Sequence, residues 1–201
     1  MFFAMAVLVA VTAVVGTAQQ ESIEELRVRA EQGDAEAEFD LGTFYDMGYN
    51  VPQDATEAAR WYRLAAEQGH AFAQFNLGTF YDMGYGVPED AAEAARWYRL
   101  AADQGIAVAQ FNLANMYATG RGVPMDVVTT YMWAIIASRI DNALMVSETM
   151  TISGYRDAVA AALTSKERDE GQRLAGEWET AHPDDSLIRE PDIEFNTTAP
   201  Q

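Results

Sequence analysis

A sequence repeat of 36 residues occurs three times in succession in this chain, beginning at Ala35, Ala71 and Ala107. The first two copies differ at only eight positions, whereas the third copy has diverged further. Repetition at a fixed period of this length is typical of proteins in which one supersecondary unit stacks on the next. The repeat therefore restricts the possible folds more than any single residue does.

The first half of each copy has the pattern of a helix followed by a turn. In the second copy, apolar and small residues at three-to-four-residue spacing predict a helix over about residues 71–83. Gly78 lies inside this helix, and we expect it to permit close approach of a neighbouring helix. In the turn, Gly86 fits a backbone position with positive φ. Asn50, the residue that tolerates this conformation best after glycine, replaces it one copy earlier.

The second half of each copy predicts another helix. Asp90 begins it, with Glu93 three residues later as in a capping box, and Gly105 ends it. Glu93 and Arg96 are spaced to form a weak surface ion pair on one helix face, as are their counterparts Glu57 and Arg60. One such helix pair cannot bury its apolar face alone, but stacked pairs can. The predicted fold is all-α, a right-handed solenoid of stacked helix–turn–helix units.

Three motifs recur in the copies at the 36-residue period: Leu-Gly-x-x-Tyr, Gly-x-Gly-Val-Pro-x-Asp and Ala-x-x-Trp-Tyr-x-x-Ala-Ala-x-x-Gly. In the second copy they comprise Leu77, Gly78, Tyr81, Gly84, Gly86, Val87, Pro88, Asp90, Ala94, Trp97, Tyr98, Ala101, Ala102 and Gly105. This pattern resembles the Sel1-like repeat family, which is related to tetratricopeptide repeats but has a longer period. The resemblance covers residues 35–142. It implies adaptor or regulatory roles, often with envelope or membrane complexes.

The chain begins with an apolar segment, residues 1–18, which we interpret as a signal peptide with cleavage before Gln19. It has no Lys or Arg ahead of the apolar run, which departs from the usual signal-peptide pattern. An uncleaved signal anchor is the alternative, because about 18 apolar residues are at the lower limit of what spans a bilayer. Both interpretations predict export, to the periplasm or to the periplasmic face of the inner membrane. Residues 19–34 match the end of a repeat, and we expect them to form a half-repeat that covers the first exposed end of the stack.

The three repeats are predicted at residues 35–70, 71–106 and 107–142, and the remaining chain is less regular. Residues 143–181 are expected to form a degenerate repeat and a C-terminal capping helix. Before that helix we predict two helical stretches, separated near Ser153 and Gly154. Thr164 and Glu167 have the spacing of a capping box that opens the last helix. Residues 182–201 are acidic and poor in apolar residues, which predicts a disordered tail.

The formal net charge is −18, and Lys166 is the only lysine. A nucleic-acid partner is not expected, because phosphate binding needs Lys and Arg patches. Membrane contact is expected only if residues 1–18 are uncleaved. The excess of acidic residues can be a solvated surface that keeps a repeat protein soluble and monomeric. Alternatively, it can attract a partner with a basic face.

Few residues suit catalysis or ligand chemistry. The chain has no cysteine and two histidines, His70 and His182, both of which fit ordinary loop or terminal positions. The carboxylates recur because the repeat recurs, so no acid pair stands apart from it. No Ser-x-x-Lys motif precedes Lys166, and no calcium or phosphate loop is present in the sequence. We therefore expect no enzymatic activity, no metal site and no cofactor.

We expect function to reside on the inner surface lined by the first helix of each repeat. Positions there that the scaffold does not use should form a polar row beside an aromatic row, able to bind a protein or peptide. The candidate partner-binding residues are Asp40, Thr43, Phe44, Met47, Asn76, Thr79, Phe80, Met83, Asn112, Asn115 and Met116. The competing interpretation is that Phe44 and Phe80 pack between repeats. Tyr49 and Tyr85, in the turns, form a second aromatic pair that we expect to be exposed.

The leading hypothesis is thus a non-catalytic exported scaffold that acts as an adaptor or regulator of an envelope complex. An accessory subunit of an inner-membrane complex, anchored by residues 1–18, is one alternative. A protein that binds cell wall or exopolysaccharide through tyrosine and tryptophan faces is another. A hydrolase that uses paired carboxylates is the least favoured hypothesis.

Overall fold

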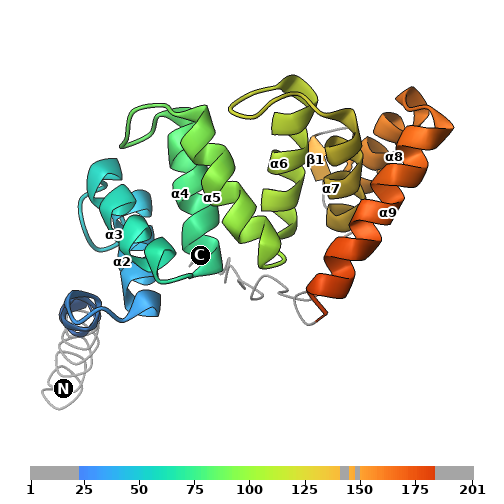
Figure 1. Ribbon diagram of the computed structural model, residues 1–201. Helices are drawn as coiled ribbons and strands as arrows, with labels where there is room; N and C mark the ends of the chain where they lie inside the picture. Colours follow the sequence, from blue (N-terminus) through green and yellow to red (C-terminus); the bar gives the residue numbers. More distant parts are fainter. Residues whose placement is uncertain (1–22, 141–144, 148–149, 184–201) are drawn as a thin grey trace, which may run out of the picture. The chain divides into compact units, whose positions relative to one another are not determined.

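The computed structural model describes residues 23–140, 145–147 and 150–183. A helical segment at residues 23–31 comes first. The elements that follow are α2 (Ala35–Met47), α3 (Ala55–Glu67), α4 (Ala71–Met83), α5 (Ala91–Asp103), α6 (Ala107–Thr119), α7 (Val127–Ile140), β1 (Met145–Ser147), β2 (Met150–Thr151), α8 (Ile152–Ala162) and α9 (Ser165–Ala181). The fold is therefore helix–turn–helix repeats, as predicted, with one small hairpin (Figure 1). None of the helices in the described ranges is long and apolar enough to cross a membrane.

The chain divides into two compact units, one ending at Asp90 and the other beginning at Ala91. In the first unit, α2 packs against α3, and α3 packs against α4. Leu26 and Ala30, from residues 23–31, are buried in one apolar cluster with Leu41 and Trp61. The segment that precedes the first repeat thus covers apolar side chains of α2 and α3.

Short polar and left-handed residues set the limits of α2 and α3. The Asp34 carboxylate accepts the N–H of Ala37, and Gly48 ends α2 in the left-handed conformation, at φ 68°. The Asp54 carboxylate accepts the N–H groups of Thr56 and Glu57 at the start of α3. Side-chain acceptors at this position satisfy backbone donors that have no partner inside the helix. These caps set the limits of α2 and α3, each of which is 13 residues long.

The turn between the two helices contains the predicted positive φ. Asn50 has φ 58° and Gly86 has φ 69°. Gly86 also lies against the preceding repeat, because a Cβ placed on it would be 2.1 Å from the carbonyl oxygen of Ala55. A Cβ on Gly122 would likewise be 2.1 Å from the carbonyl oxygen of Ala91. Glycine in this turn thus permits both the left-handed backbone conformation and the close packing of one repeat on the next.

A second glycine position permits close packing inside a repeat. A Cβ on Gly42 would be 2.7 Å from Cδ1 of Tyr62, so the Tyr62 ring lies directly on the backbone of α2. Gly42 is the counterpart of Gly78, for which close approach was predicted from the sequence. Because no other residue leaves this space, glycine is retained in the middle of a helix despite its cost in helix propensity.

In the second unit, α7 packs against α6, α8 and α9. Its residues 131–138 are all buried, as the apolar sequence there predicts. Trp133 is fully buried, and its ring meets that of Trp178 in α9 edge to face, with centroids 5.8 Å apart. The indole N–H of Trp178 donates to Asp103 at 3.2 Å. The predicted capping box of Thr164 and Glu167 opens α9.

The prediction for the segment between α7 and α8 was wrong. Two helical stretches separated near Ser153 and Gly154 were expected, but β1 and β2 pair there as a short antiparallel hairpin. Ser153 and Gly154 lie in the first turn of α8, because the Thr151 hydroxyl accepts the N–H of Gly154 and caps the helix. Thr151 therefore ends the hairpin and starts the helix, and glycine here lies within a helix rather than between two. Residues 1–22 and 184–201, on which the signal-peptide and tail predictions fall, lie outside the described ranges.

Candidate partner-binding surface

The buried hydroxyl of Tyr62 lies among polar side chains of α2 and α4. It donates to Oγ1 of Thr43 at 3.3 Å, while the Thr43 hydroxyl itself donates to the carbonyl of Phe39. The side chains of Asn76 and Asp46 also influence the pKa of this hydroxyl. Burial raises the pKa of Tyr62 to about 12, so the side chain stays neutral. Tyr62 of α3 thus contacts the first helices of two repeats, Thr43 of α2 through its hydroxyl and Phe80 of α4 through its ring.

Burial also raises the pKa of two carboxyl groups on α2. The pKa of Asp46 is raised mainly by burial, and the Tyr62 hydroxyl opposes this effect. The pKa of Asp40 is raised by burial and, to a smaller extent, by the negative charge of Glu36. Both carboxyls are half-buried. The first-helix surface of this unit is therefore acidic, and part of its negative charge is already poorly solvated.

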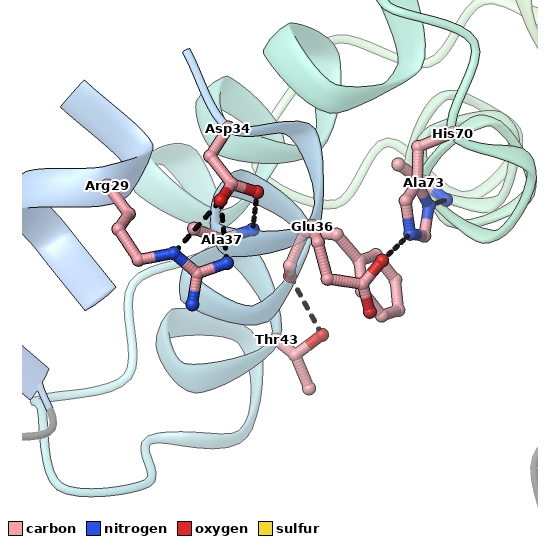
Figure 2. A network of polar contacts seen from close by, with 8 residues as sticks. Arg29, Asp34, Glu36, Ala37, Thr43, His70 and Ala73 are labelled. Carbon is pink, nitrogen blue, oxygen red and sulfur yellow. Dashed lines mark hydrogen bonds and ion pairs between the residues drawn. The ribbon is translucent and has the colours of Figure 1, made fainter. Parts of the chain in front are cut away.

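His70 connects the amino-terminal ends of α2 and α4 (Figure 2). Its Nδ1 accepts the backbone N–H of Ala73 at 3.1 Å, and its Nε2 lies 3.1 Å from a carboxylate oxygen of Glu36. The ring stacks on Phe39, with centroids 4.4 Å apart. His70 is therefore the N-cap of α4, a more definite role than the ordinary loop position expected from the sequence.

Buried amide side chains fasten each repeat to the helix before it. Nε2 of Gln74 donates to the carbonyl of Ala66, and Nε2 of Gln110 donates to that of Ala102, both at 3.1 Å. Glu38 occupies the equivalent place in the first repeat and is 3% exposed. It accepts a hydrogen bond from Gln68 at 2.7 Å. Burial raises the pKa of the Glu38 carboxyl. This row of residues is structural and is not available to a partner.

The ends of α2 and α4 expose apolar side chains. Met47 is 69% exposed and Met83 is 72% exposed. Tyr49 and Tyr85, two residues further on in each turn, are also exposed. Such methionines and tyrosines contribute little to the core and are residue types that suit protein contacts.

Comparison with known proteins identifies the repeat. The family model described as Sel1 repeat matches residues 35–70, 71–106 and 107–142, more than half of the chain. The chain belongs to the Sel1 repeat family. The three matches coincide with the three copies in the sequence, so the predicted limits of the repeats agree with those of the Sel1 model. A search of curated proteins found no match.

Solved Sel1-type structures share the fold. One is a protective antigen from uropathogenic Escherichia coli strains that displays an SLR fold, with TM-score 0.59 and 27% identity. The match covers 83% of this chain but only 42% of the antigen. Another is a Sel1 repeat protein from Oxalobacter formigenes, with TM-score 0.53 and 32% identity, where 76% of this chain and 98% of the other are covered. The chain is thus a Sel1 repeat scaffold, and scaffolds of this class generally mediate protein–protein interaction.

The predicted contact residues of the Sel1 repeats separate into two groups. Phe80 and Met116 are each only 4% exposed, so they do not line a free surface. Phe80 packs edge to face on Tyr62 and Tyr85, with ring centroids 5.4 and 5.0 Å apart, as the competing interpretation held. The remaining predicted residues are exposed or half-buried: Asp40, Thr43, Phe44, Met47, Asn76, Thr79, Met83, Asn112 and Asn115.

The sequence interpretation missed two contributors to this surface. Tyr62 was assigned to the repeat motif, yet its hydroxyl donates to Thr43 of α2 and its ring packs on Phe80 of α4. Gln53, one of the eight differences between the first two copies, donates to the hydroxyl of Tyr85 at 3.2 Å and to the carbonyl of Asp46 at 2.7 Å. A polar residue in a turn is ordinary, so the sequence gave no indication that Gln53 would connect two repeats. Among the described residues, no group of three or more His, Cys, Asp or Glu side chains is arranged to hold a metal ion.

Proposed function

We propose that this Sel1 repeat chain is a non-catalytic scaffold that binds a protein or peptide partner through the first helices of its repeats. The observation that supports this most is the position of Tyr62 behind the surface, where its hydroxyl donates to Thr43 of α2 and its ring packs on Phe80 of α4. Residues fixed in this way lose little conformational entropy on binding, which favours their use as contacts. Exposed Met47 and Met83 extend the same helices with apolar area.

The scaffold is proposed to work outside the cytoplasm, as an adaptor or regulator of an envelope complex. The support is the apolar sequence of residues 1–18 with its small residues before Gln19. Mass spectrometry of the protein isolated from its host decides how the segment is used. A mature N-terminus at Gln19 supports a free exported scaffold. An intact Met1 in the membrane fraction would replace this with an accessory subunit anchored by residues 1–18.

Site-specific photo-crosslinking in the host tests the binding surface. A photoreactive residue is placed at Asp40 or Asn112 on first helices, and at Arg60 or Glu67 on the exposed side of α3 as matched controls. We expect one protein to be crosslinked from the first-helix positions and not from the controls. Equal crosslinking from all four positions, or crosslinking only from α3, would contradict the proposed surface.

A further inference from the structure

Two successive turns carry the same exposed pair of residues. Met47 and Tyr49 follow α2, and Met83 and Tyr85 follow α4, with exposed fractions of 69%, 54%, 72% and 39% in that order. We call these four residues the turn-edge strip. Exposed apolar side chains that occur together in this way mark a contact surface more often than single ones do, because burying them is favourable.

Contacts within the first unit hold the turn-edge strip in place. The Tyr49 ring packs edge to face on Phe44, and the Tyr85 ring packs in the same way on Phe80, with centroids 5.4 and 5.0 Å apart. Gln53, in the first turn, donates to the Tyr85 hydroxyl in the second turn at 3.2 Å. The two turns are therefore adjacent, and their aromatic rings are positioned before any partner arrives.

The strip is not required by the helix–turn–helix scaffold. The third repeat has Thr119 and Arg121 where the first two have methionine and tyrosine. Its turn nevertheless has the same backbone, with Gly120 at φ 69° and Gly122 at φ 70°. The N–H of Gly120 bonds to the carbonyl of Met116, as the N–H of Gly84 does to that of Phe80. Since the turn forms equally well without them, the Met and Tyr side chains have another use.

The sequence around the strip is acidic. Residues 43–54 hold Asp46 and Asp54, and residues 79–90 hold Asp82, Glu89 and Asp90, while neither segment contains Lys, Arg or His. Arg63 reaches α4 from α3, but its guanidinium donates to the Tyr81 hydroxyl and lies over that ring, 5.5 Å from the centroid. A negative potential around an apolar strip complements a segment that presents apolar side chains beside Lys or Arg.

We infer that the turn-edge strip binds a basic amphipathic segment of a partner protein, whose apolar side chains cover the methionines and tyrosines. This inference rests on the proposed scaffold function and specifies the chemistry of its partner. A second copy of this chain is a poorer occupant, because the chain carries a net charge of −18 and docking would bring acidic surroundings against each other.

Fluorescence anisotropy with designed peptides provides the test. The probe is a labelled Leu/Lys peptide of about 18 residues, long enough to form an amphipathic helix. Its control is the same peptide with every Lys replaced by Glu. The variant Met47→Ser/Met83→Ser removes apolar area without changing charge. Met125→Ser is the matched control, because Met125 is also 69% exposed but lies in the third turn.

We expect the Leu/Lys peptide to bind the full chain and the Leu/Glu peptide not to bind. The double variant should raise the Kd by about tenfold or more, since it removes the apolar contact of two methionines. Met125→Ser should leave the Kd unchanged, and added salt should weaken binding. Equal affinity for the double variant and the wild-type chain would overturn the inference, because attraction by charge alone does not need the strip.

Two other results separate this inference from the scaffold function. If the Leu/Lys peptide fails to bind while Asp40 and Asn112 still crosslink to a protein, the basic-partner inference is rejected and the scaffold function stands. Sedimentation shows whether a second copy covers the strip. A wild-type dimer that becomes monomeric in Met47→Ser/Met83→Ser would also reject the inference.

Discussion

The imidazole of His70 caps α4 of the second repeat by accepting the backbone N–H of Ala73 on Nδ1 at 3.1 Å, while its ring stacks on Phe39 of α2 in the first repeat. One side chain thus satisfies a helix terminus and joins two repeats. In the next copy Ile106 stands at this place and makes no side-chain hydrogen bond to the cap. Ile106 is 2% exposed, so apolar packing replaces the polar cap there.

Replacing His70 with Ala should destabilise the chain by about 1 kcal/mol, the usual effect of losing an N-cap. The measurement is the urea midpoint of the far-UV helix signal. His70→Asn is the informative control, because its side-chain oxygen can accept the same N–H although it cannot stack on Phe39. If His70→Asn restores most of the stability, the cap dominates. If it behaves like His70→Ala, the stacking does. An unchanged midpoint for His70→Ala would show that neither contact matters.

Gly86→Asn is expected to be strongly destabilising even though it copies the residue that the first repeat uses at Asn50. Both positions have positive φ, and Asn tolerates that conformation. Gly86 differs from Asn50 in its surroundings, because a Cβ on Gly86 would lie 2.1 Å from the carbonyl oxygen of Ala55. We expect a loss of about 2 kcal/mol or more through backbone displacement. The converse substitution, Asn50→Gly, should change stability by only a few tenths of a kcal/mol. Similar midpoints for the two variants would contradict the steric argument.

Tyr62→Phe should raise the pKa of Asp46 further, because the Tyr62 hydroxyl now lowers it against the effect of burial. It should also lower stability by about 1 kcal/mol, since Thr43 loses a buried hydrogen-bond partner. The Asp46 carboxyl can be followed by NMR titration. A pKa of Asp46 that stays the same or falls in Tyr62→Phe would show that this hydroxyl does not stabilise the carboxylate.

The repeated part of the chain was the most predictable from the sequence. The exchange of Asn50 for Gly86 between copies indicates a positive φ at this turn position, and both residues have it. The Glu57–Arg60 and Glu93–Arg96 ion pairs were also predicted from spacing and are present. Such features depend on residues a few positions apart, and successive copies give independent examples of each.

Features that depend on one copy or on contacts between repeats were harder to predict. The hairpin of β1 and β2 has no counterpart in the three repeats with which to compare it. Phe80 and Met116 were predicted to line the binding surface, but both are buried. The first helices carry apolar residues on several faces, so the sequence pattern does not show which face is covered. His70 and Gln53 differ from their counterparts, and each hydrogen-bonds with a residue of the following repeat, Ala73 and Tyr85 respectively.

Glu38→Gln is predicted to stabilise the chain at neutral pH. Gln74 and Gln110 occupy the equivalent positions in later repeats, and each donates to the carbonyl eight residues before it. Glu38 is equally buried, but an ionised carboxylate cannot donate. The amide in Glu38→Gln carries no charge and can still accept from Gln68 through its oxygen. Removing a poorly solvated charge in this way should add about 1 kcal/mol at neutral pH.

The effect of Glu38→Gln should depend on pH with a defined sign. Burial raises the pKa of Glu38 above its value in the unfolded chain, so the folded state binds a proton more tightly than the unfolded state does. Ionised Glu38 therefore destabilises the fold at pH values above its raised pKa, and this penalty disappears as the pH falls below the unfolded value. The advantage of the variant should be largest near neutrality and small at about pH 4, near the unfolded pKa of a glutamate. Urea midpoints of both chains across this range measure the difference, because all other groups titrate alike in the two proteins. An advantage that grows as the pH falls would mean that the ionised carboxylate of Glu38 stabilises the fold, contrary to the effect of its burial.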